Sequence, residues 1–145
     1  MRRPRLHDMF DIANKIGLSD VLQEKSTLAE SAQNSTAKGI KLLTSGPAAP
    51  DATALLEKNI QALLQDACSD YDIILLDTPA AQAVSDAAVL ASFVDGVLVV
   101  VSHKHAHRHS VKSMCRQLNR VNARLIGVVI NHTKPEPTYR YYQPV

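Results

Sequence analysis

Four short apolar runs constrain the fold of this 145-residue sequence more than any other feature. They span residues 40–43, 73–76, 97–101 and 125–130 and consist mostly of valine, isoleucine and leucine. Each run is too short for a helix, and none alternates apolar with polar residues as a half-buried strand does. We therefore expect four strands that are buried on both faces.

The segments between these runs have the apolar spacing of helices. Residues 51–67, 85–93 and 110–121 place apolar side chains three and four positions apart or are rich in alanine. Strands that alternate with helices predict an α/β fold, in which helices cover both faces of a parallel sheet. We expect one such domain over residues 1–133, followed by a proline-interrupted tail over residues 134–145.

Charge and composition exclude several classes of partner and location. The formal net charge is +2, too close to neutral to predict binding to nucleic acid or to an anionic membrane. The longest clean apolar run, Val97 to Val101, is far shorter than the roughly 20 residues that span a bilayer, so we expect no direct membrane insertion. Cys68 and Cys115 have no C-x-x-C spacing and no secretory leader before them, which favours reduced thiols in the cytosol.

Two polar residues directly follow expected strands. Asp77 comes after the run at 73–76, and Asn131 after the run at 125–130. Ligands of parallel α/β sheets bind at the carboxyl ends of the strands, where both residues are expected. The alternatives are a helix N-cap or a turn before Pro79 for Asp77, and a turn-forming side chain for Asn131.

An acid at the end of such a strand holds Mg²⁺ in nucleotide-binding proteins whose glycine-rich loop cradles the phosphates. That loop has the pattern G-x-x-x-x-G-K-[ST], and no two of the five glycines here have the required spacing. We thus expect the residue that would bind the metal of a nucleotide site, but not the glycine-rich loop that would bind its phosphates. A lone carboxylate is a poor Mg²⁺ site, because this ion relies on waters and substrate phosphates for most of its ligands.

The tail contains three of the four tyrosines, Tyr139, Tyr141 and Tyr142. It has no apolar periodicity to bury them, so an exposed cluster of phenols is one interpretation. Such a cluster is a good phosphoryl acceptor, because each phosphate adds roughly −1.5 to −2 charges. The alternative is that these aromatic rings pin the tail onto the domain.

Two further groups have competing interpretations. Alternate histidines in residues 103–109 have a spacing that suits a metal, but no cysteine or acid accompanies them, so we expect a solvated loop. Asp86 is interpreted as a helix N-cap in preference to an acid in a switch region.

Several blocks of the sequence together resemble one protein family. They are RRPRLHDMF at 2–10, GLSDVL at 17–22, LLTSGPAAPDATALL at 42–56, YDIILLDTPA at 71–80, SDA at 85–87 and GVVIN at 127–131, with the tyrosine cluster after them. In this order and at these separations, they resemble the cytoplasmic domain of bacterial tyrosine autokinases. These kinases regulate exopolysaccharide and capsule synthesis and form a branch of the MinD and ParA group of P-loop ATPases.

The resemblance implies a function for each candidate residue. In a complete kinase, Asp77 would be the catalytic carboxylate that organises Mg²⁺, and Asn131 would bind the adenine of ATP. Tyr139, Tyr141 and Tyr142 would accept the γ-phosphoryl group, between neighbouring subunits. The implied partners are other copies of the chain and a membrane polysaccharide co-polymerase, at the inner face of the plasma membrane.

The sequence also departs from the family pattern. The family has its phosphate-binding loop and a second strand with two aspartates before the Arg-Arg-Pro block, where this sequence has Met1. We therefore expect an N-terminally incomplete P-loop domain that does not catalyse phosphorylation alone, through truncation or through degeneration. The alternatives are a non-catalytic regulatory or interaction subunit, and a positioning ATPase similar to MinD or ParA.

Overall fold

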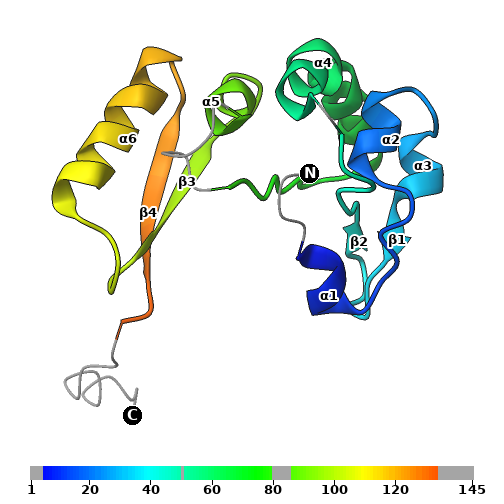
Figure 1. Ribbon diagram of the computed structural model, residues 1–145, viewed down its shortest axis with the longest axis horizontal. Helices are drawn as coiled ribbons and strands as arrows, with labels where there is room; N and C mark the ends of the chain where they lie inside the picture. The colour runs from blue at the N-terminus through cyan, green and yellow to red at the C-terminus, as the bar shows by residue number, and fades with distance from the viewer. Residues whose placement is uncertain (1–4, 50, 80–85, 134–145) are drawn as a thin grey trace.

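The computed structural model describes residues 5–49, 51–79 and 86–133, and Figure 1 shows their arrangement. The helices are α1 (Leu6–Phe10), α2 (Leu18–Leu22), α3 (Leu28–Ser31), α4 (Ala52–Asp70), α5 (Asp86–Ala91) and α6 (Arg108–Arg120). The strands are β1 (Gln33–Asn34), β2 (Lys41–Leu42), β3 (Val97–Ser102) and β4 (Leu125–Asn131).

Strands β3 and β4 form a parallel pair, with Val99 opposite Val128 and Ser102 opposite Asn131. Helix α6 connects the two strands, as a parallel pair requires. A buried apolar cluster joins β3 to the neighbouring helices α5 and α6, and it consists of Ala91, Val99, Leu118 and Ala123. Both helices therefore pack against the same face of this small sheet.

The longest helix, α4, organises the other half of the molecule (Figure 1). It begins where the Asp51 side chain accepts a hydrogen bond from the N–H of Ala54 at 3.2 Å, which caps the first turn. Leu56 and Ile60 of α4 are buried against Leu22 of α2, and Leu90 of α5 packs against the same cluster. This contact joins the two halves of the structure.

The parallel strands and the three helices that follow the apolar spacing are confirmed. The runs at 97–101 and 125–130 are β3 and β4, and the helices expected over 51–67, 85–93 and 110–121 are α4, α5 and α6. The α/β class is confirmed too. Helices on the second face of the sheet are not present in the described part of the chain, where the side chains of Leu98 and Val100 are exposed.

The expected buried strand at 73–76 is wrong for this structure. Residues 71–79 run without a β-ladder between α4 and the β3–β4 half (Figure 1), and Ile73 and Leu75 are 78% and 89% exposed. A strand is stable only when its backbone pairs with a neighbour, and within the described ranges no strand pairs with this segment. The run at 40–43 is likewise reduced to β2, which pairs antiparallel with β1.

Candidate functional site

The carboxyl ends of β3 and β4 bring together the polar residues of the candidate site. Ser102 and Asn131 are partners in the ladder, and the N–H of His103 donates to the carbonyl oxygen of Asn131 at 2.9 Å. The hydroxyl of Ser102 lies 3.2 Å from Nδ1 of His132. This is the edge where ligands of parallel sheets bind, so the expected position of Asn131 is confirmed.

A local hydrogen bond fixes the amide of Asn131. Its Oδ1 accepts from the backbone N–H of His132 at 2.7 Å, which identifies the oxygen and leaves the NH₂ group free to donate. His132 has a left-handed backbone (φ 58°), an uncommon conformation for a residue with a side chain. The turn-forming alternative for Asn131 therefore describes part of what the side chain does, and its exposed NH₂ group remains available to a ligand.

Asp77 lies in the segment 71–79, and its side chain is exposed. The carboxylate makes no hydrogen bond or ion pair with the other described residues. No group of three or more histidine, cysteine, aspartate or glutamate side chains is placed to hold a metal within residues 5–49, 51–79 and 86–133. The structure therefore offers Asp77 as a free oxygen ligand and does not bring it to the same sheet edge as Asn131.

The three tail tyrosines, Tyr139, Tyr141 and Tyr142, lie outside the described residues, as does the expected domain boundary at residue 134.

Asp86 differs from its expected role. It is the first residue of α5 rather than the residue before the helix, and its side chain is buried, with 5% exposed. Its Oδ1 accepts a hydrogen bond from the Thr53 hydroxyl of α4 at 2.6 Å. This bond joins α5 to the first turn of α4, and the sequence indicated it only through the acid at the start of an alanine-rich helix.

A clasp between two loops was also missed in the sequence. We use the name loop clasp for the contacts of residues 14–19 with residues 44–46. Asn14 Oδ1 accepts from the N–H of Gly46 at 2.9 Å, and the N–H of Leu18 donates to the Thr44 carbonyl at 2.8 Å. Gly46 has a φ of 69°, a left-handed backbone that favours glycine. The sequence signal that could have revealed the loop clasp is the presence of two glycines, Gly17 and Gly46, beside polar residues.

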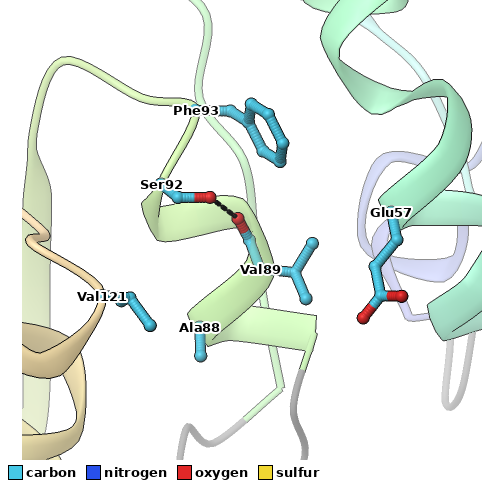
Figure 2. A pocket seen from close by; sticks show the side chains of 6 residues that line it. All are labelled: Glu57, Ala88, Val89, Ser92, Phe93 and Val121. Atoms are coloured by element: carbon cyan, nitrogen blue, oxygen red, sulfur yellow. Dashed lines mark hydrogen bonds between the residues drawn. The ribbon is translucent and has the colours of Figure 1, made fainter.

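A shallow hollow of about 340 Å³ lies between α4, α5 and α6 (Figure 2). Its lining is almost entirely apolar, and it consists of Glu57, Ala88, Val89, Ser92, Phe93 and Val121. The Ser92 hydroxyl donates to the Val89 carbonyl at 2.7 Å and is thus already satisfied. None of the residues that the sequence proposed for function lines this hollow, which has one charged group and no pair of reactive side chains.

No helix among the described residues has both the length and the hydrophobicity needed to cross a bilayer.

Comparisons with known proteins show what the chain is similar to. No family model matches it. It is 33% identical over 145 residues to the tyrosine-protein kinase YwqD of Bacillus subtilis, an alignment that covers 98% of this chain and 61% of YwqD. Its fold matches the VpsO kinase domain with a TM-score of 0.86 at 29% identity, over 92% of this chain and 66% of that one. It matches the kinase domain of Escherichia coli tyrosine kinase ETK with a TM-score of 0.84 at 30% identity, over 97% of this chain and 57% of that one.

The similarity therefore extends along nearly the whole of this chain in sequence and in fold. The chain spans about three fifths of the length of the curated relative YwqD.

Proposed function

Because this chain is homologous to the bacterial tyrosine-protein kinases and shares the fold of their kinase domains, we propose that it forms the C-terminal part of such a kinase. The complete enzyme transfers the γ-phosphoryl group of ATP to tyrosines of its own tail and thereby regulates exopolysaccharide synthesis. The observation that carries this proposal is the agreement of sequence and fold over more than nine tenths of the chain.

The described residues fit one part of an ATP and Mg²⁺ site. The Asp77 carboxylate is exposed and has no competing partner among the described residues, and Mg²⁺ prefers such hard oxygen ligands. When bound, Mg²⁺ supplies neutralisation of the charge on the phosphates. The free NH₂ group of Asn131 would donate to an acceptor nitrogen of adenine, and the second lone pair of its Oδ1 would accept from the exocyclic amine.

The phosphate half of the site is not encoded in the 145 residues, which contain no G-x-x-x-x-G-K-[ST] pattern. In phosphoryl transfer, most of the catalysis comes from positioning and from neutralising the charge of the phosphates. The chain by itself is therefore proposed to be inactive, while its tail remains a substrate.

Tyr139, Tyr141 and Tyr142 are the proposed phosphoryl acceptors. Three phenols in twelve residues that also carry Arg140 and Lys134 provide a cluster whose charge reverses on phosphorylation. In this proposal the phosphoryl group is transferred between neighbouring copies of the chain. The chain also docks to a membrane polysaccharide co-polymerase and lies at the cytoplasmic face of the membrane.

The test is a labelling experiment with radioactive ATP and Mg²⁺. The isolated chain is expected to incorporate no label, and addition of YwqD is expected to label it on the tail. A variant with phenylalanine at positions 139, 141 and 142 is expected to lose the label, whereas Tyr71→Phe, which removes the fourth tyrosine, is expected to keep it. Labelling of the chain alone, or undiminished labelling of the triple variant, contradicts the proposal.

A second function, that of a non-catalytic interaction subunit, is favoured by one observation. Among the described residues, no helix covers the face of the β3–β4 sheet that carries Leu98 and Val100, and both of these apolar side chains are exposed. Exposed apolar patches of this kind mark interaction sites.

A further inference from the structure

Charged residues are distributed unevenly along the chain. Residues 96–133 contain six lysines and arginines and no aspartate or glutamate, whereas the remaining residues contain ten basic and fourteen acidic side chains. Residues 96–133 form β3, α6, β4 and the connections between them. The six basic side chains are all exposed, and they are Lys104, Arg108, Lys112, Arg116, Arg120 and Arg124. This part of the molecule is therefore strongly positive, which the net charge of +2 for the whole chain conceals.

Four of these side chains form a stripe along α6, and we call them the basic face. They follow one another at intervals of four residues and are Arg108, Lys112, Arg116 and Arg120. Each interval turns the helix by only about 40°, so all four project from one side. Met114 and Leu118 lie on the opposite side and pack into the apolar cluster around Val99. The basic face therefore points away from the sheet, and α6 lies at the edge of the molecule, on the far side from α4 (Figure 1).

The stability of α6 does not explain the basic face. Like charges four residues apart repel each other on a helix surface, and Arg108 is a cation in the first turn, where the helix dipole favours an acid. No ion pair between described residues includes a member of the basic face. Helix α4, by contrast, carries one lysine among three acids. An anionic partner accounts for the uniform sign of the charges on α6.

The chemistry of the basic face favours a lipid surface over a protein or a nucleic acid. The core of a protein interface is apolar and rich in aromatic residues, and single-stranded nucleic acids stack their bases on aromatic side chains. Residues 96–133 contain no phenylalanine, tyrosine or tryptophan. Duplex DNA takes the N-terminal residues of a recognition helix into its major groove. The basic face instead extends along about 18 Å of helix, which suits a flat anionic surface.

We propose that α6 docks on an anionic lipid bilayer, with its axis parallel to the membrane and the basic face against the headgroups. The apolar side of α6 is occupied by the sheet, so the attraction is electrostatic and no side chain inserts into the bilayer. Each basic residue near such a surface contributes about fivefold to the partition coefficient. The inference goes beyond the proposed kinase activity and is independent of it.

Co-sedimentation with lipid vesicles tests this docking. The 145-residue chain is expected to bind vesicles made of equal parts of phosphatidylcholine and phosphatidylglycerol and not to bind vesicles of phosphatidylcholine alone. Binding is expected to weaken as the salt concentration rises, because salt screens the attraction. The double variant Lys112→Gln, Arg116→Gln is expected to lower the partition coefficient about 25-fold. Both side chains are exposed, so this variant is expected to keep the native circular dichroism spectrum.

The double variant Lys38→Gln, Lys58→Gln is the matched control, because it removes the same charge at exposed lysines outside residues 96–133. Its partition coefficient is expected to stay within about twofold of native, because distant charges are screened. Equal binding to both kinds of vesicle, or equal weakening by the two double variants, overturns the proposal. So does displacement of the chain from anionic vesicles by duplex DNA at equal phosphate concentration, which identifies nucleic acid as the occupant.

Discussion

Substitution of Gly17 by alanine is the sharpest test of the loop clasp. A Cβ atom at this position meets the backbone nitrogen of Gly46 and the carbonyl oxygen of Thr44 closer than real Cβ atoms approach such groups. It also lies 2.8 Å from the Cα of Gly46. All three contacts are with backbone, which cannot rotate away as a side chain does. The two loops must therefore separate.

Separation of the loops breaks the hydrogen bonds that hold them together. These are Leu18 N–H to Thr44 O (2.8 Å), Ser19 N–H to Ser45 O (3.0 Å) and Gly46 N–H to Asn14 Oδ1 (2.9 Å). Each such bond contributes about 0.5–1.5 kcal/mol net, and an overpacked site costs about 1–3 kcal/mol. Alanine in turn raises the free energy of unfolding by about 0.4–1 kcal/mol, because it restricts the unfolded chain more than glycine does. With the central value of each contribution, the expected loss in the free energy of unfolding is about 4 kcal/mol.

Urea unfolding followed by far-UV circular dichroism measures this loss. At m-values of about 1–3 kcal/mol per molar urea, the midpoint is expected to fall by more than about 1 M. Gly127→Ala is the control, because its added methyl group meets only Leu98 Cδ1 at an ordinary 3.5 Å. Its free energy of unfolding is expected to stay within about 1 kcal/mol of native. A Gly17→Ala protein no less stable than this control refutes the reasoning.

Three further perturbations test other parts of the structure. Thr53→Val removes the hydroxyl that donates to the buried Asp86 carboxylate at 2.6 Å, so urea unfolding is expected to show a loss of about 1–3 kcal/mol; an unchanged midpoint would contradict a stabilising role for this bond. Ile60→Ala empties a site that is 1% exposed and is expected to cost about 2–5 kcal/mol in the same assay, whereas a loss below 1 kcal/mol would mean that α4 is not packed as described. Hydrogen bonds from the Thr27 backbone N–H and hydroxyl lower the pKa of Glu30, so this carboxylate stabilises the fold above its unfolded pKa, and the effect is lost as pH falls through the lowered folded pKa. Thr27→Ala is expected to raise the pKa of Glu30 toward its ordinary value in an NMR titration, and an unchanged titration curve would show that the Thr27 hydroxyl does not contribute.

The predictions that held were those set by local sequence. Helix α4 follows from its apolar spacing and from Asp51 as its cap, and β3 and β4 follow from their valine and isoleucine content. Asn131 was placed correctly, because the end of a strand that does form fixes it. In each case the partners that stabilise the element are nearby in the sequence or are present in the described chain.

The predictions that failed required contacts that the sequence pattern does not specify. Residues 73–76 have the composition of a strand, but a strand exists only as part of a ladder, and a periodicity says nothing about whether a neighbour is present. Asp86 was assigned to a cap from its place in the sequence, whereas one partner of its carboxylate, Thr53, lies 33 positions away. The loop clasp depends in the same way on pairs about 30 positions apart, and single-sequence patterns do not identify such pairs.

The position of Asp77 connects these failures to function. A catalytic carboxylate must be held within about 0.5 Å of its productive geometry, and residues 71–79 have no ladder to hold it. A neighbouring strand that paired with this segment and a nucleotide that bound Asp77 and Asn131 would stabilise the same arrangement, so each would strengthen the other by the same factor. The described residues of the chain supply no such strand. ATP with Mg²⁺ is therefore expected to leave amide hydrogen exchange at residues 72–76 of the isolated chain as fast as it is without nucleotide. Slower exchange at these residues would show that the chain orders the Asp77 segment without a further strand.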